Sequence, residues 1–166
     1  MHPCLEQTLA VIEAAVLGMP PEWWTRAPEG KWSAEQVLEH LDLTFEASVR
    51  SLRRGLEKGN VARPRSWLAL AAQLVVVDVG YFPRGRTAPE GMAPAGGRGA
   101  SVVDHIRRHL AEMDELMTVF VAKLGPGATF THPALGPMTV RQWRRFHLVH
   151  ARHHMKQVTR LRKGQT

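Results

Sequence analysis

Apolar residues recur every three or four positions along four stretches of the chain, and this spacing predicts amphipathic helices. The first predicted helix runs from about Leu5 to Leu17 and stops at residues 18–21, which read Gly-Met-Pro-Pro. The second begins at Ser33, which forms a capping box with Gln36, and ends near residues 58–59. Its apolar residues share one side of the helix: Val37, Leu41, Phe45, Leu52 and Leu56.

Two further helices are predicted in the second half of the chain. One opens at residues 101–104 (Ser-Val-Val-Asp) and stops at residues 125–127 (Gly-Pro-Gly). Its apolar stripe consists of Ile106, Leu110, Met113, Met117, Phe120 and Leu124. The last helix opens at Thr139, which forms a capping box with Gln142, and runs to about Lys163. No convincing alternation of apolar and polar residues indicates a strand, and residues 131–137 are rich in turn formers.

These patterns predict an all-α protein, an antiparallel four-helix bundle with extra short helix or loop segments. A length of 166 residues suits a single domain that spans residues 1–166. Residues 67–79 are nearly apolar but contain Gln73 and Asp78, and a bilayer crossing needs about 20 residues. We therefore expect a buried helix there and no membrane partner. Residues 82–100, rich in Pro, Gly and Arg, are expected to form a loop or lid.

The charge of the chain is concentrated in its last helix. The net charge is +7, and from residue 139 onward there are eight basic residues and no acidic one. The rest of the chain holds 22 − 8 = 14 basic residues against 15 acidic ones. The single cysteine, Cys4, excludes an internal disulfide, and residues 1–6 lack the basic region of a secretion signal, so we expect a cytoplasmic protein.

Four of the nine histidines lie within residues 147–154, and a helical projection predicts which way they face. With Val140 at 0° and about 100° per residue, the apolar residues of the last helix fall between about 300° and 0°. His147 and His154 fall at about 340° and 320°, inside that arc, and His150 falls at about 280°, at its edge. His153 lies on its flank at about 220°, near Gln157, and the basic residues occupy the opposite side. Three imidazoles therefore point into the bundle, where burial without partners would be costly.

His150 and His154 are four positions apart, the spacing at which one helix can offer two nitrogens to one metal ion. Surface histidines also fall at this spacing by chance, and buried ones can be satisfied by hydrogen bonds. His105 and His109 share the spacing but drift off the apolar stripe of their helix, so we expect an ordinary boundary pair.

His40 is the natural candidate for a third ligand. It lies about 120° from the centre of the apolar stripe of its helix, so a boundary position and a ligand role both remain open. A row of small residues aligns with it: Thr44, Ala47 and Ser51. No special role is expected for His2 and His132, and Trp143 and Phe146 are expected to be core residues.

Two segments together carry a family resemblance. Residues 30–41 (Gly-Lys-Trp-Ser-Ala-Glu-Gln-Val-Leu-Glu-His-Leu) resemble the opening of the second helix of the DinB-like superfamily. Residues 132–139 (His-Pro-Ala-Leu-Gly-Pro-Met-Thr) and 150–157 (His-Ala-Arg-His-His-Met-Lys-Gln), with Trp143 and Phe146 between them, resemble the last helix of its uncharacterised branch with a His-Pro turn. These motifs cover about a third of the chain, and their order and separation also match.

The resemblance implies a four-helix bundle that holds a divalent metal with three histidines, which map here to His40, His150 and His154. It also implies that homodimers are common, and that the better-understood members transfer low-molecular-weight thiols. Three neutral imidazoles suit zinc or nickel and leave a coordination position open. His153 or Gln157 could orient a ligand ring, although a hydrogen bond to solvent is the simpler role for each.

We therefore expect a small-molecule metalloenzyme, a thiol-dependent transferase or a hydrolase, that takes anionic ligands such as a thiolate or a carboxylate. A metal-stabilised bundle without catalysis is the first alternative. A nucleic-acid-binding module that uses the basic last helix is the second, and it is disfavoured because the aromatic residues face inward and the basic side is a plain helical surface.

Overall fold

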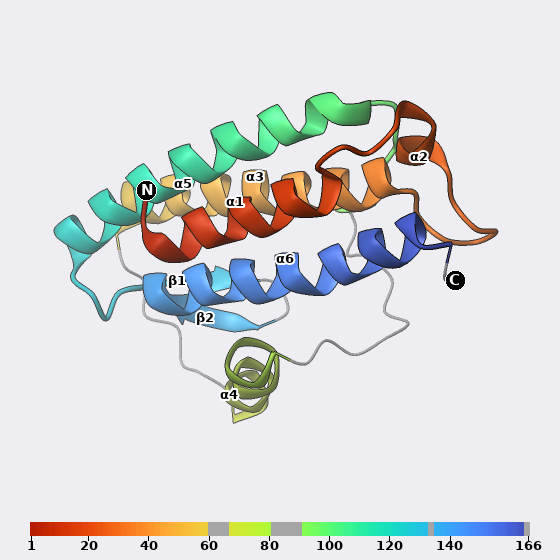
Figure 1. Cartoon of the computed structure of the whole chain (residues 1–166). Helices are drawn as coiled ribbons and strands as arrows, with labels where there is room; N and C mark the ends of the chain where they lie inside the picture. Colours follow the sequence, from red (N-terminus) through yellow and green to blue (C-terminus); the bar gives the residue numbers. More distant parts are fainter. Residues whose placement is uncertain (60–66, 81–90, 133–134, 165–166) are drawn as a thin grey trace.

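The computed structural model describes residues 1–59, 67–80, 91–132 and 135–164, which form a bundle of four long helices (Figure 1). The helices are α1 (Pro3–Val16), α3 (Ala34–Lys58), α5 (Val102–Leu124) and α6 (Val140–Arg162). Each begins and ends within a few residues of its predicted position, because capping residues and Gly or Pro residues mark its ends. The predicted all-α bundle is confirmed.

Two capping boxes fix where α3 and α6 begin. The Ser33 hydroxyl accepts a hydrogen bond from the Gln36 backbone N–H (3.3 Å), and the Gln36 side chain accepts one from the Ser33 N–H (3.0 Å). Thr139 and Gln142 make the same pair of bonds at 3.3 and 2.9 Å. A fixed first turn also fixes which later residues face the interior, since each residue advances the helix by about 100°.

The four helices form two parallel pairs. α1 packs against α6 and α3 packs against α5, and the first pair runs in the opposite direction to the second (Figure 1). The helices of a pair can run the same way because the chain between α3 and α5 returns to the end of the bundle at which α3 began. The predicted antiparallel arrangement is therefore correct between the pairs but not within them.

The core lies between these helices and contains most of the predicted stripe residues, although Leu56 and Leu124 are only partly buried. The bulkiest side chains with less than 2% exposure include one aromatic residue each from α3 and α5, Phe45 and Phe120. The others are aliphatic or Met residues: Leu5, Ile12, Leu38, Leu41, Leu52, Ile106, Leu110, Met113, Met117 and Met138. Trp143 and Phe146 are also buried, as predicted.

A small hairpin precedes α6, and the sequence pattern did not predict it. β1 (Thr129–His132) pairs antiparallel with β2 (Gly136–Thr139), with Phe130 opposite Met138. The expectation that no strand is present is wrong, because strands of four residues are too short to show a clear alternation. The hairpin is tied to the last helix, since Trp143 Nε1 donates a hydrogen bond to the Phe130 carbonyl (3.1 Å).

The apolar segment at residues 67–79 folds as α4 (Trp67–Gln73) followed by a π-helix at Leu74–Val79. The prediction that it is a buried helix is wrong. It packs on the outside of a bundle whose core is already filled, and only Gln73 and Val77 are buried. Its outward side chains are exposed: Trp67, Leu68, Leu70, Leu74, Val75 and Val79.

Two short helices complete the described chain. α2 (Pro21–Thr25) follows the predicted stop after α1 and is one of the extra short segments that were expected without a position. A 3-10 turn at Gly99–Ser101 leads into α5. Residues 91–98 have no regular secondary structure, whereas residues 82–90 of the predicted loop lie outside the described residues. Among the helices described, none combines the length and the apolar character that a membrane crossing requires.

Candidate metal centre

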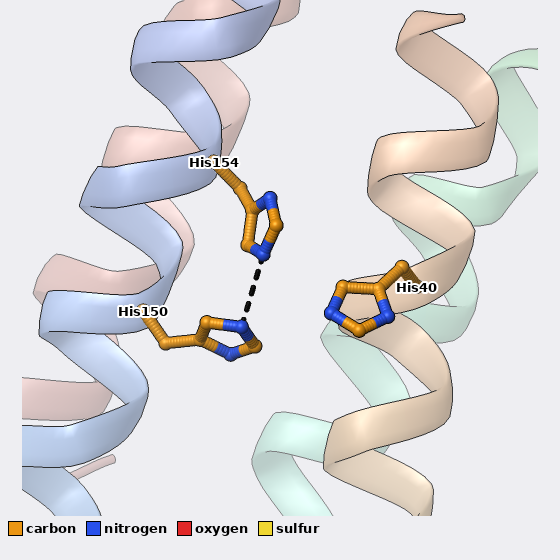
Figure 2. A group of neighbouring side chains, drawn as sticks. All are labelled: His40, His150 and His154. Carbon is orange, nitrogen blue, oxygen red and sulfur yellow. Dashed lines mark hydrogen bonds between the residues drawn. The ribbon is translucent and has the colours of Figure 1, made fainter. Parts of the chain in front are cut away.

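Three buried histidines from two helices face one another (Figure 2). His40 belongs to α3, and His150 and His154 lie one turn apart on α6; their exposed fractions are 6%, 6% and 7%. Each offers a ring nitrogen, and these three nitrogens all lie within 4.8 Å of one another. The ring centroids are 4.6 to 5.4 Å apart. The structure thus brings together the three residues predicted as ligands, and it decides the open question of His40 in favour of burial.

Two ring nitrogens of this His40–His150–His154 cluster meet directly. Nε2 of His150 and Nε2 of His154 are 3.0 Å apart, and His40 faces both rings (Figure 2). A tetrahedral zinc ion, with Zn–N distances of about 2.0–2.1 Å, holds its ligand nitrogens about 3.3–3.4 Å apart. His150 and His154 are near that spacing, and His40 would approach them by at most about 1.5 Å. The donor set therefore fits a transition-metal ion.

The far nitrogens of two rings are held by hydrogen bonds that set the tautomer. His40 Nδ1 donates to the Met92 carbonyl (2.8 Å), and His154 Nδ1 donates to the Gln157 side-chain oxygen (2.9 Å). With the proton on Nδ1, the lone pair of Nε2 points toward the other histidines. Gln157 thus takes the orienting role that the sequence offered as one of two possibilities.

Burial keeps the three rings neutral. It lowers the pKa of His40, it lowers the pKa of His150 well below the ordinary value, and it lowers that of His154 to about 3. Mutual repulsion among the cationic forms lowers the values of His150 and His154 further. At neutral pH the rings are therefore uncharged, which is the state that binds a metal. His150 Nε2–H donates to the lone pair of His154 Nε2, so this proton must leave Nε2 before all three nitrogens can bind one ion.

Aromatic rings hold the cluster in place. Phe146 stacks on His150 with centroids 5.3 Å apart, and Trp32 lies 5.1 Å from the ring of His40. His153 is half-buried on the flank, as predicted, with its ring 5.2 Å from that of His154. Phe146 and Trp32 limit the rotation of the His150 and His40 rings.

His147 faces the interior, as predicted, but does not join the cluster. Its ring is fully buried against Phe45, Trp143 and Phe146. In the described part of the chain, neither of its nitrogens has a hydrogen-bond partner. Burial lowers its pKa to about 3, so it is a neutral core residue.

The remaining histidines stay outside the cluster. His109 is half-buried and its Nδ1 lies 2.7 Å from a carboxylate oxygen of Asp42, while His105 is half-buried nearby, in line with a boundary pair. His2 accepts a hydrogen bond from the Cys4 N–H and so caps α1. His132 accepts one from the Leu135 N–H, and burial lowers its pKa to about 4.

Sequence reasoning missed a group of charged residues beside His40. Glu35, Glu39 and Asp42 are buried on α3 and pair with residues 96–99. A signal was present, since acidic residues at positions i, i+4 and i+7 form a stripe on a helix. Their partners, however, belong to a loop whose path has no sequence signature.

Comparison with known proteins agrees with this architecture. The family model of the DinB superfamily matches residues 5–158. This range includes α1 from residue 5, all of α3 and α5, α6 up to residue 158, and all three clustered histidines. No curated protein and no solved structure matches the chain. Because the family match extends over nearly the whole sequence, the chain belongs to the DinB superfamily.

Proposed function

We propose that this protein binds one divalent transition-metal ion, zinc or nickel, through His40, His150 and His154, and uses it in small-molecule chemistry. The observation that carries the proposal is the convergence of three buried, neutral imidazoles from α3 and α6. Imidazole nitrogens suit these metals, and three ligands leave a position for a further group. The reaction class that fits best is thiol-dependent transfer or hydrolysis.

The residues of the site would have two roles, which are to bind the ion and to orient the binding rings. His40, His150 and His154 would hold the ion, which when bound lowers the pKa of a coordinated thiol or water and so supplies a nucleophile near neutral pH. Gln157 and the Met92 carbonyl keep the rings of His154 and His40 oriented. The positive charge of the bound ion would favour an anionic thiolate or carboxylate as ligand.

Elemental analysis tests the proposal. Protein purified without a chelator or a histidine tag should contain about one equivalent of zinc or nickel per chain, as expected for a three-histidine site. The variant His150→Ala should lose it, because two nitrogens hold the ion far less tightly than three. The matched control His153→Ala, a neighbour on the flank of α6, should keep the metal. Less than about a tenth of an equivalent, with no uptake of added zinc or nickel, would contradict the proposal.

A metal-stabilised bundle without catalysis is the second candidate. It is favoured by the burial of all three histidines, of which none is more than 7% exposed. Structural metal sites are enclosed, whereas catalytic ones keep an accessible position. Metal removal that lowers the melting temperature, together with no turnover in a broad screen of thiol and hydrolase substrates, would select this candidate.

A nucleic-acid role receives less support. The outer face of α6 carries exposed basic residues, but Trp143 and Phe146 are buried and offer no stacking surface.

A further inference from the structure

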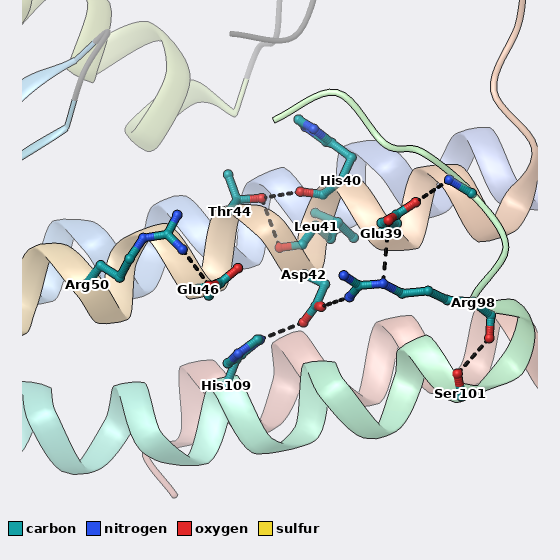
Figure 3. A network of polar contacts seen from close by, with 11 residues as sticks. Glu39, His40, Leu41, Asp42, Thr44, Glu46, Arg50, Arg98, Ser101 and His109 are labelled. Atoms are coloured by element: carbon teal, nitrogen blue, oxygen red, sulfur yellow. Dashed lines mark hydrogen bonds and ion pairs between the residues drawn. The ribbon is translucent and has the colours of Figure 1, made fainter. Parts of the chain in front are cut away.

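Residues 92–99, which we name the strap, cross α3 beside the histidine cluster. The strap starts at His40, on the side of α3 that faces α6, passes over Glu39 and reaches α5 at Arg98 (Figure 3). It has no regular secondary structure before the 3-10 turn that begins at Gly99. Its position must therefore come from contacts with α3.

Three buried carboxylates of α3 hold the strap. The N–H of Gly96 donates to Glu39 (2.6 Å) and the N–H of Gly99 donates to Glu35 (2.9 Å). Arg98 donates to Asp42 (2.8 Å), and its Nε lies 3.5 Å from Glu39. These carboxylates are 7% exposed or less. A buried carboxylate is stable only when it is paired, so the strap and the acidic stripe require each other.

Glycine lets the strap backbone adopt the conformation that brings it against α3. Gly96 and Gly97 have φ values of +83° and +89°, in the left-handed region that side chains disfavour. A Cβ atom at position 96 would lie 3.4 Å from a Glu35 carboxylate oxygen and 3.7 Å from the Gln36 side chain. The glycine-rich sequence around Arg98 thus serves the contact with α3.

The other end of the strap reaches the candidate metal centre. The Met92 carbonyl accepts the hydrogen bond from His40 Nδ1, and this bond places the proton away from the cluster. Arg98 is the charged side chain that joins the strap to α3, and Asp42 receives His109 of α5 on its other oxygen. Figure 3 shows the part of the network that joins His109 of α5, Asp42 and Arg98. The bond from His40 to the Met92 carbonyl extends it to His40.

We propose that Arg98 is a positioning residue for His40. By pairing with Asp42 and Glu39 it holds the strap, so that the Met92 carbonyl fixes His40 as the Nδ1–H tautomer with Nε2 directed at His150 and His154. The role in metal affinity rests on the proposed function, whereas the tautomer is a property of the metal-free chain. Arg98 itself acts only through the strap.

Nitrogen NMR of the metal-free full-length protein tests the positioning directly. His40 in the wild type should show a protonated Nδ1 and an unprotonated Nε2. In Arg98→Ala both tautomers should be present, and zinc affinity should fall by about 10- to 100-fold, as for loss of a residue that orients a metal ligand. Arg98→Lys should restore part of the Nδ1–H tautomer population and part of the zinc affinity, since lysine keeps the positive charge but lacks the planar guanidinium that can bind two carboxylates. Gly96→Ala, which strains the strap and leaves every charge in place, should act as Arg98→Ala does and serves if that variant does not fold.

The control is Arg107→Ala, which removes another arginine of the same region. Arg107 pairs with Glu13 and Asp104 and with no strap residue among those described. It should leave the His40 tautomer and zinc affinity unchanged. An unchanged tautomer in Arg98→Ala and Gly96→Ala, or an equal effect of Arg107→Ala, would overturn the proposal. A wild type that takes up no zinc would instead refute the proposed function, and the tautomer measurement would still decide the role of the strap.

Discussion

His147 is the residue whose burial has the least compensation. Its ring is fully enclosed, and within the described chain no hydrogen-bond partner reaches either nitrogen. An unsatisfied buried polar group costs about 1–3 kcal/mol. Its pKa of about 3 lies below the ordinary 6.5, so the unfolded chain binds a proton here at pH values where the folded chain does not. Protonation of His147 in the unfolded chain therefore does not reduce the free energy of unfolding above about pH 6.5. It reduces the free energy of unfolding progressively as the pH falls from 6.5 toward 3.

The variant His147→Leu should remove both penalties. We expect it to be at least as stable as the wild type at pH 7.5, and increasingly more stable than the wild type as the pH falls from 6.5 to 4. Urea unfolding at several pH values measures this. Met155→Leu, a buried change on the same helix that does not titrate, should leave the pH slope unchanged. A wild-type slope that persists in full in His147→Leu would contradict the assignment.

Sequence alone predicts part of the cluster at the residue scale. Periodicity places His147, His150 and His154 inside, because α6 starts at a capping box and is straight enough for a simple projection. Periodicity does not predict whether His40 is buried, because the burial of that ring depends on the approach of α6 and of the Met92 carbonyl. Both are long-range contacts that no local pattern encodes.

At the scale of elements, helices with strong caps are predictable and short elements are not. Ser33 and Thr139 mark the starts of α3 and α6 in the sequence as well as in the structure. β1 and β2 have four residues each, and they are stabilised by pairing with each other and by the Trp143 hydrogen bond. The apolar segment at residues 67–79 misleads because composition does not reveal that the core is already full.

At Gly55 the backbone of α3 lies close to a side chain of α5. A Cβ atom there would lie 2.9 Å from the ring of Phe120, which is fully buried and packs against Phe130. Alanine normally stabilises a helix relative to glycine by about 1 kcal/mol, but overpacking a core costs about 1–3 kcal/mol.

We therefore expect Gly55→Ala to destabilise the protein by about 1 kcal/mol, measured by urea unfolding. The exposed neighbour Arg54→Ala should change stability by less than about 0.5 kcal/mol. An increase in stability of Gly55→Ala would mean that the two helices are farther apart than the structure places them.

At the scale of the whole molecule, the histidine cluster joins the two helix pairs. His40 belongs to the α3–α5 pair, and His150 and His154 belong to the α1–α6 pair. A ligand that binds only the folded state stabilises it by about 2.7 kcal/mol when its free concentration is 100 times its Kd. For a protein of this size, that corresponds to a rise in melting temperature of about 5–10 °C.

Removal of metal should reverse this gain. We expect a chelator to lower the melting temperature of the loaded wild type by about 5–10 °C, and zinc to restore it. His154→Ala should show no response to either reagent, while His153→Ala should respond as the wild type does. A wild type that binds metal without any change in melting temperature would contradict a site that exists only in the folded protein.

The boundary between the helix pairs has a consequence for how the molecule opens. Elsewhere the pairs meet through apolar side chains and ion pairs such as Arg107–Glu13. Beside the strap they meet through three imidazoles, which attract one another only weakly when no ion is bound between them. Under the proposed function the ion is a removable cross-link between His40 on α3 and the pair His150 and His154 on α6. In the sequence, the connection from α3 to α5 lies between them. The halves of the bundle would then part most readily in cells starved of metal, and the lifetime of the folded chain would follow the metal supply.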